Sequence, residues 1–471
     1  WERFRDRRGF TQTFGVPTER MRNGDFGEVA AVYASFHLYN PFTGAANGSG
    51  RTQFPNVAIP SNLIDPIARS VLSYYPLPNT NQDLNSNQLL DDYSIPREIQ
   101  VNRDNYDAKL TWQRTSAHTV WGKFAMLNAD VVDNFQLGFD NGSLGHTRVY
   151  VATAGHTWTL GNSVLLDGNF GVNIQNQQVT GPDFGSNFGL DLGIPGVNDP
   201  NDIRASGLPR FQIGAAAAGA ANIYAIGTTP NWMPLFRRER SYTFSSALTK
   251  ALRRHDLRLG VDIIRHELNH RQAEFGDYGL RGGFSFSGNI TGAPGYTPLL
   301  WNQFAALLLG RPSFFSKDVQ TEEMTGREWQ SAIFFRDRWN VTANWTLSLG
   351  LRAEYYPLMT RADRGIERLD YNTYEVLIGG LGNVPKDVGI NLKKWYIAPR
   401  VGTMYRLNEN AVVRAGYGRT INPLPWSRPM RGSFPQDINF NRTAEQFFWV
   451  GTLGDGIPPV PIPDISSGRV K

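Results

Sequence analysis

Apolar and polar residues alternate along two neighbouring stretches of the chain. From Trp345 to Tyr355 apolar side chains occupy every other position, and polar or charged side chains fill the positions between them. The stretch from Trp329 to Asn340 repeats this alternation, and the short segment Val341–Asn344 connects the two. A period of two residues is typical of a β-strand with one apolar and one polar face. The pattern therefore predicts two long strands joined by a tight turn.

A soluble β-sandwich also alternates, but three features of this hairpin favour a membrane barrel. Each strand has about ten residues, which is the length that crosses a bilayer at a tilt. The apolar face carries aromatic residues near its ends, where membrane interfaces place them. The opposite face carries arginine and glutamate, which suit a water-filled lumen better than a packed core.

The same alternation recurs in other stretches and assigns individual side chains to the two faces. We expect the lumen to be lined by Lys109, Asp167, Asn169, Arg336, Arg338, Arg352, Glu354, Arg400 and Arg414. We expect lipid or the membrane interface to meet Trp112, Trp158, Phe170, Trp339, Trp345, Leu347, Leu349, Leu351 and Tyr355. The tryptophans among them would also suit a row that stacks on sugars, although an interface girdle is the favoured interpretation.

Length and composition agree with an all-β, antiparallel transmembrane β-barrel that has long external loops and a few short loop helices. The chain has 471 residues and no clear linker, and a closed sheet can grow without a larger core. The longest strongly apolar run, Phe304–Leu309, is far shorter than a transmembrane helix. The absence of cysteine excludes disulfides and thiolate metal sites. The net charge of +5 is dispersed, so nucleic-acid binding is not supported.

Two regions are expected along the chain. Residues 1–100 are rich in turn formers and predict a long loop or cap, with one short helix at 65–74 that Asp65 caps and Pro66 begins. Residues 101–471 predict roughly twelve barrel strands and their loops. A second short helix is expected at 298–310. Tight turns alternate with very long loops such as 177–240, which predicts periplasmic turns and external loops.

Several runs of residues resemble TonB-dependent outer-membrane receptors. The hairpin has the family pattern in Asp337–Thr342 and Trp345–Tyr355, and the runs 398–402 and 413–418 are similar to the next two strands. Four N-terminal runs resemble the Oar-like subgroup of this family: Pro17–Phe26, Tyr39–Gly44, Ile59–Pro66 and Tyr75–Asn79.

The resemblance implies a barrel of roughly 22 strands, a plug, a TonB box and a carboxypeptidase-regulatory-like domain in the whole protein. None of the last three is found in this sequence, and the final strands are missing, so we expect an internal barrel fragment. The resemblance also implies outer-membrane lipid, a TonB-type energy-coupling protein and an external ligand as partners. No ligand motif of the family maps onto this chain.

One motif suggests enzymatic chemistry. His266-Glu267-Leu268-Asn269-His270 matches the HExxH signature of zinc proteases, which needs a helix to bring both histidines to one metal. Here the motif continues a predicted strand, where the two histidines would lie about 13 Å apart and Glu267 would point to the other face. The Asp/Asn-rich segment 198–202 lacks the spacing of a calcium loop, and no phosphate-binding loop or nucleophile elbow is found.

Three functions follow from these observations. The first is TonB-dependent uptake of a ligand across the outer membrane of a Gram-negative bacterium, without catalytic residues, cofactor or metal. The second is adhesion or surface organisation by the same external loops. The third, a zinc peptidase built on His266 and His270, is remote because of the strand context.

Overall fold

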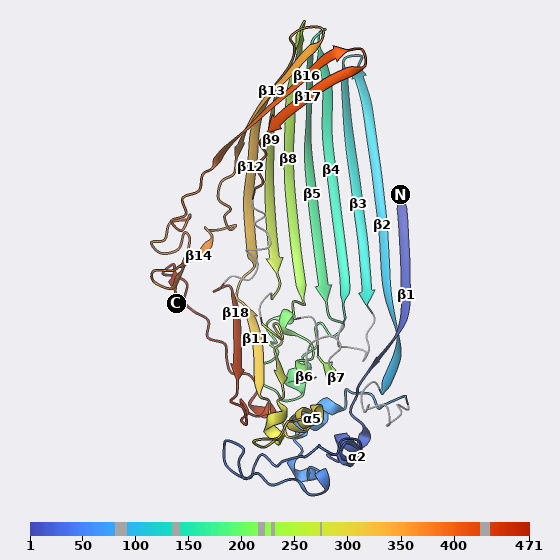
Figure 1. Ribbon diagram of the computed structural model, residues 1–471, viewed down its shortest axis with the longest axis vertical. Coiled ribbons are helices and arrows are strands. Elements are labelled where there is room, and N and C mark those ends of the chain that lie inside the picture. Colours follow the sequence, from blue (N-terminus) through green and yellow to red (C-terminus); the bar gives the residue numbers. More distant parts are fainter. Residues whose placement is uncertain (81–91, 134–141, 215–221, 228–230, 274–275, 424–433) are drawn as a thin grey trace.

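The computed structural model describes residues 1–80, 92–133, 142–214, 222–227, 231–273, 276–423 and 434–471. Within them, eleven strands form one antiparallel sheet in which the order along the chain is kept (Figure 1). These strands are β1 Glu2–Phe14, β2 Tyr93–Thr115, β3 His118–Asp133, β4 Leu144–Leu160, β5 Val164–Thr180, β8 Leu235–Leu252, β9 His255–Arg271, β12 Met324–Asn340, β13 Trp345–Tyr355, β16 Trp395–Asn408 and β17 Ala411–Gly418. The all-β prediction is confirmed.

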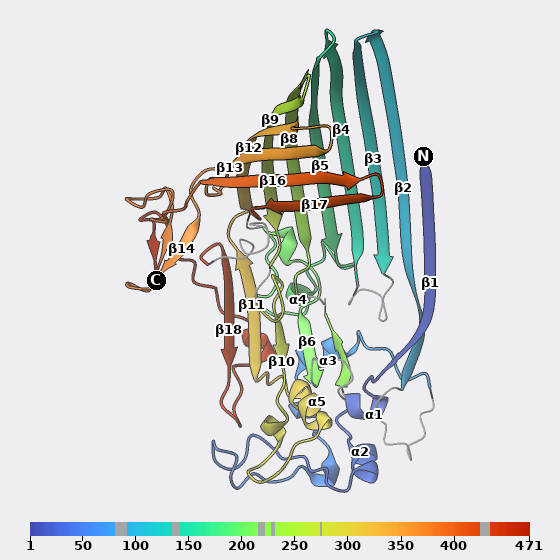
Figure 2. The same cartoon turned by 45° about the horizontal axis from the view of Figure 1, so that its top comes forward.

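The sheet is open, with β1 and β17 as its edges. It is also strongly coiled, since β16 and β17 run almost across the direction of β2–β5 in Figure 2. The predicted hairpin is present: β12 and β13 pair from Ser331 with Tyr355 to Asn340 with Thr346. In the described part of the chain, no helix has both the length and the apolar character needed to cross a membrane.

Short and long connections lie at opposite ends of the sheet. The hairpin turns β2–β3, β4–β5, β8–β9, β12–β13 and β16–β17 contain two to four residues each and gather at one end (Figure 1). The segments that leave the other end are much longer. This alternation of tight turns and long loops is the one that the sequence predicts.

The long segments fold together into one unit, which we call the cap: the described parts of residues 15–80, 181–227, 276–320 and 434–457. Its mixed sheet has the order β18-β11-β10-β6-β7. The strands are β6 Arg210–Gly214, β7 Asn222–Ile226, β10 Gly283–Ser285, β11 Phe314–Gln320 and β18 Asp437–Thr443. The helices are α1 Glu19–Arg22, α2 Gly27–Val32, α3 Pro66–Leu72, α4 Phe188–Asp191 and α5 Leu300–Leu308, and the 3-10 turns are η1 Pro55–Val57, η2 Ser61–Leu63, η4 Ile203–Ala205, η5 Gly288–Thr291 and η6 Leu453–Asp455.

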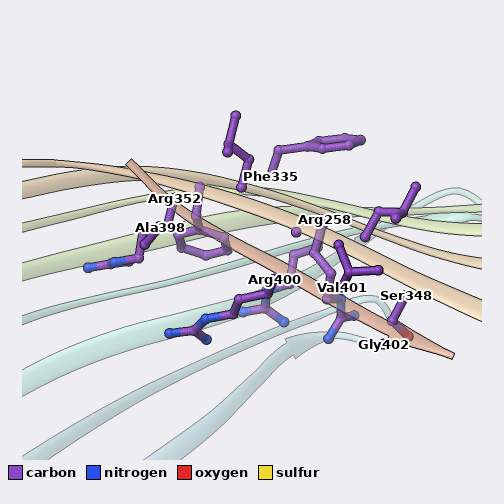
Figure 3. Close-up of a pocket in the computed structure, with 13 residues that line it drawn as sticks. Arg258, Phe335, Ser348, Arg352, Ala398, Arg400, Val401 and Gly402 are labelled. Atoms are coloured by element: carbon purple, nitrogen blue, oxygen red, sulfur yellow. The ribbon is translucent and has the colours of Figure 1, made fainter. Parts of the chain in front are cut away.

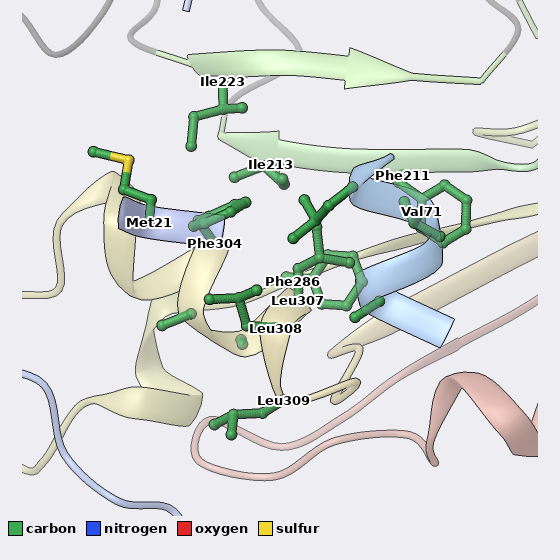
Figure 4. Close-up of a cluster of buried hydrophobic side chains, with 14 of the residues drawn as sticks. Met21, Val71, Phe211, Ile213, Ile223, Phe286, Phe304, Leu307, Leu308 and Leu309 are labelled. Atoms are coloured by element: carbon green, nitrogen blue, oxygen red, sulfur yellow. The ribbon is translucent and has the colours of Figure 1, made fainter. Parts of the chain in front are cut away.

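One hydrophobic core joins these loops, and helix α5 lies within it (Figure 4). Phe304 is fully buried, and so are Phe211 and Phe284 from the small sheet. The predicted helix at 298–310 is present, and it is buried on more than one side, because Ala305 and Ala306 are buried as well as Phe304. Loops that are far apart in sequence surround this helix and bury most of its residues.

Helix α3 has the predicted start. The Asp65 carboxylate accepts hydrogen bonds from the backbone N–H groups of Ile67 (2.8 Å) and Ala68 (3.0 Å), and Pro66 follows it. These bonds satisfy donors that a helix N-terminus would otherwise leave free. Residues 1–100 hold more than a loop, however, because β1 and the first residues of β2 within this range are strands of the large sheet.

A third, smaller unit follows β13. It contains β14 Glu367–Asp370, β15 Glu375–Ile378 and β19 Arg469–Val470, which form a three-stranded sheet. Its own core consists of Met359, Ile366, Leu377, Val384 and Val388.

Candidate functional site

Strand register sorts the predicted site residues onto two faces of the large sheet. Directly paired residues of antiparallel strands share a face. Leu351 pairs with Phe335, which pairs with Leu259, whereas Arg352 pairs with Phe334 on the opposite face. When the register is traced through all the strand pairs, every predicted lumen-facing residue lies on one face of the sheet. Every predicted lipid-facing residue lies on the other face. We call these the charged face and the apolar face. That the apolar face meets lipid remains a prediction.

Aromatic side chains form two rows on the apolar face. The row near the tight turns contains Trp112, Trp158, Trp339 and Trp345, and the row nearer the cap contains Tyr106, Tyr150, Tyr242, Trp329, Tyr355 and Trp395. On β12 and β13 the rows are ten residues apart, or about 33 Å along the strand. At the tilt of about 40° common in barrels, this spacing spans a band about 25 Å high, which is the height of a lipid-facing belt.

Ion pairs that reach over an intervening strand cover the charged face. Arg258 on β9 contacts Asp167 on β5 at 3.1 Å, and Arg352 on β13 contacts Asp262 on β9 at 2.6 Å. Arg352 also bonds Glu354 at 2.8 Å, so its guanidinium group has two carboxylate partners. In the described part of the chain, ion-pair partners are lacking for Arg338, Arg400 and Arg414. Other interactions include a pair between Arg336 and Asp256 and the packing of Lys109 against the Trp121 ring.

A hollow of about 570 Å³ lies beside β13 and is lined by Arg258, Arg336, Arg352 and Arg400 together with apolar residues. Figure 3 shows Arg258, Arg352 and Arg400 on one side of the strands, while Phe335 points to the other side. Because Arg258 and Arg352 are paired and Arg400 is not, this wall offers a cationic group to a passing or bound anion. The arrangement suits the binding and passage of an anion.

The HExxH motif lies on strand β9, as the alternation predicts. Consecutive residues of a strand point to opposite faces, so Glu267 faces away from His266 and His270. His266 Nδ1 lies 2.8 Å from Ser241 Oγ, and Glu267 accepts a hydrogen bond from Arg265 at 2.9 Å. Among the described residues no group of three His, Cys, Asp or Glu side chains is placed to hold a metal. The zinc-protease arrangement is therefore not formed on this strand.

Buried charges tie the cap segments together. Arg51 donates to the carbonyl oxygens of Asn289, Ile290 and Gly292 at 2.8–3.1 Å and to that of Phe447 at 3.0 Å. Lys317 donates to Gly196 O and Val197 O. Sequence reasoning missed both residues because their partners are backbone atoms of distant segments, which leave no pattern in the sequence.

Two buried acids complete this network. Asp183 lies 3.5 Å from Arg281, and both side chains are almost fully buried. Burial raises the pKa of Asp318 in β11 to about 8, and Asn439 Nδ2 donates to its Oδ1 at 2.8 Å. Burial therefore favours the protonated form of Asp318 in the folded cap.

An open antiparallel sheet with an aromatic-bordered apolar face, a charged face, tight turns at one end and long loops at the other has the design of an outer-membrane barrel wall. Residues 1–470 match the family described as outer membrane beta barrel domain, and the chain belongs to this family. It is a protein of the Gram-negative outer membrane.

No curated protein matches the chain. Among solved structures, the ferripyoverdine receptor of the outer membrane of Pseudomonas aeruginosa, bound to ferripyoverdine, is 13% identical, with 69% of this chain and 37% of that chain covered and a TM-score of 0.37. The FpvAI–pyocin S2 complex is 12% identical over 69% of this chain and 37% of that chain, with a TM-score of 0.39. The outer membrane transporter YddB from Escherichia coli is 10% identical over 70% of this chain and 41% of that chain, with a TM-score of 0.35. The chain thus spans well under half the length of these proteins.

Proposed function

We propose that this chain forms barrel wall and external loops of a TonB-dependent outer-membrane transporter that takes up a ligand through the barrel interior. The observation that carries the proposal is the charged face, whose cross-strand ion pairs and unpaired arginines suit a water-filled path. The resemblance to the Oar-like subgroup implies that the whole protein has a plug and a TonB box. These parts in turn imply a TonB-type energy-coupling protein as a partner.

The unpaired arginines on the charged face favour an anionic ligand. Arg338, Arg400 and Arg414 present guanidinium groups that lack a carboxylate among the described residues, so a carboxylate or phosphate of a passing solute gains charge-assisted hydrogen bonds there. The cap lies at the end of the sheet that carries the long loops, and in this proposal it is the first part of the protein that meets the ligand.

The full-length protein in its own bacterium tests this function. Wild-type cells, cells without the gene and cells without the TonB-type protein are grown in the same medium, and solutes lost from the medium are measured by mass spectrometry. We expect one anionic solute to be depleted only by the wild type. Arg400→Glu should slow its depletion, whereas Arg442→Glu, a matched change on an exposed residue of the cap, should not.

Equal depletion of all solutes by the three strains would overturn the transport proposal. If the strain without the gene also lost attachment or surface order, the adhesion function would replace it. Immunodetection of the variants in isolated outer membranes separates a defect in transport from a defect in assembly.

A further inference from the structure

The apolar face becomes positively charged directly beyond the aromatic row that lies nearer the cap. In that row Tyr242 pairs with Arg265, and Arg265 pairs with Trp329. The next row on the same face contains Arg240, Glu267 and Arg327, and the row after that contains Arg238 and Asn269. We call the four arginines of these rows the arginine cluster.

The arginine cluster carries more positive charge than its neighbours neutralise. Arg265 bonds Glu267 at 2.9 Å, and its guanidinium group lies 4.7 Å from the centre of the Trp329 ring. Arg238 bonds Glu323 at 3.1 Å. The other two arginines have no carboxylate partner in the described part of the chain, since Arg327 bonds only carbonyl and amide oxygens and Arg240 makes no hydrogen bond or ion pair with the residues described.

Two adjoining hollows give the arginine cluster room for a ligand. One of about 230 Å³ is lined by Arg238, Arg240, Glu267, Asn269 and Arg327. A second, of about 550 Å³, shares Arg238 and extends toward the cap. Its lining is rich in amides and includes Asn176, Gln177, Gln178, Asn201, Asp202, Arg204 and Arg271. Guanidinium groups thus line both hollows, and several amide and carboxylate groups accompany them in the second hollow.

We propose that these two hollows bind the phosphorylated sugar headgroup of a glycolipid in the outer leaflet of the membrane. Arginine binds phosphate through paired N–H groups, and amide and carboxylate side chains hydrogen-bond sugar hydroxyls. The acyl chains of such a lipid would lie along the apolar face between the aromatic rows. The proposal rests on the apolar face meeting lipid and on the long-loop end being external, and it does not require transport.

The position of the arginine cluster separates it from the proposed ligand path. Its side chains lie on the face opposite Arg352, Arg400 and the other charged-face residues, so a solute inside the barrel does not reach them. A headgroup that is anchored by its own acyl chains is held at the depth of the aromatic row, where the phosphate-binding groups begin. This match in depth favours a membrane lipid over a soluble phosphate.

The test uses the purified full-length protein in detergent and measures binding of bisphosphorylated lipid A, dephosphorylated lipid A and inorganic phosphate. We expect the wild type to prefer the bisphosphorylated lipid to the dephosphorylated lipid by at least tenfold. The double variant Arg240→Ala/Arg327→Ala should lose this preference, and lysine at both positions should restore part of it. The control Arg69→Ala/Arg442→Ala removes two exposed cap arginines and should bind like the wild type.

Equal binding of the two lipids, or an unchanged Arg240→Ala/Arg327→Ala variant, would overturn the proposal. Inorganic phosphate that competes at the same concentration as the lipid would show a soluble-anion site instead and would also overturn it. Folding of each variant is checked by its heat-dependent shift in gel mobility. Solute depletion by the same variants in cells reports separately on transport, so the two proposals fail independently.

Discussion

Placing an arginine at position 170 tests which face of the sheet meets lipid. Phe170 lies on the apolar face of β5, near the middle of the apolar part of that strand, and it pairs with Ala154 and Phe244. Its side chain is 49% exposed in the isolated chain, so lipid would contact about half of it. Asn169 is the adjacent residue at the same depth and points to the charged face, where Asp167 lies two positions away.

The expected difference between Phe170→Arg and Asn169→Arg is large. An arginine on the lipid side at the bilayer midplane costs about 2–4 kcal/mol, which is a factor of roughly 30 to 1,000 in the folding equilibrium. Asn169→Arg is expected to change stability by no more than about 0.5 kcal/mol, because water and a nearby carboxylate are available. Phe170→Ala removes the ring without adding charge and costs about 1 kcal/mol for a half-exposed side chain. It therefore separates lost packing from a misplaced charge.

The assay is urea-dependent folding of the full-length protein into lipid vesicles, followed by tryptophan fluorescence and by gel mobility without heating. The midpoint for Phe170→Arg should fall well below those of Phe170→Ala and Asn169→Arg. Equal midpoints for the two arginine variants, or a lower midpoint for Asn169→Arg, would refute the assignment of the apolar face to lipid. Position 170 is a cleaner choice than Leu349, because Leu349 pairs with Asp337, which would neutralise an added arginine.

Three further predictions concern the cap and strand β9. The pKa of Asp318 is raised to about 8, so its contribution to cap stability is fully present below the unfolded pKa of about 3.8. This contribution falls by up to about 1.4 kcal/mol per pH unit as pH rises toward 8. Hydrogen exchange of β11 should show the fall in the wild type and in the control Glu445→Gln, but not in Asp318→Asn. Arg51→Met should cost about 2–3 kcal/mol and speed proteolysis of the cap, because buried carbonyl groups lose a charged donor, and cleavage at the wild-type rate would contradict this role. Metal analysis should find the same substoichiometric zinc before and after His266→Ala, and one His266-dependent zinc per chain would restore the peptidase hypothesis.

The sequence predicts the large sheet well because the alternation of apolar and polar residues is a local property of each strand. The alternation around Trp345–Tyr355 depends only on the solvent on each side of one strand, and each partner strand repeats it. The start of α3 is equally local, since Asp65 and Pro66 satisfy the requirements of a helix N-terminus without help from other segments. Strand β1 is missed because Arg5, Arg7 and Arg8 break the apolar period there.

The cap is not predictable in this way because its contacts are not local. Helix α5 shares its core with Met21, Ile213 and Leu453, which belong to three different loops. Arg51 reaches backbone carbonyls more than two hundred residues away. No spacing within a loop indicates such partners, so the sequence of each loop predicts its turns and short helices but not how the loops pack together. The arginine cluster is missed for the same reason: its members are ordinary charged residues until strand pairing brings them side by side.

In the proposed placement the strands extend past the membrane, and this extension links the cap to the lipid surface. Strand β2 has 23 residues, whereas about ten suffice to cross a bilayer. Beyond Tyr106 the apolar face of β2 changes character, and Asp104 bonds Arg3 at 3.1 Å and Arg5 at 2.7 Å on that face. These arginines are exposed to solvent, so the proposed placement puts the outer surface of the membrane at this change. The arginine cluster lies near the same level on β8, β9 and β12, and the paired strands continue from there to the cap. In this placement a continuous hydrogen-bonded sheet holds the cap above the headgroups, and loosening the strand extension should disturb the cap and the lipid contact together.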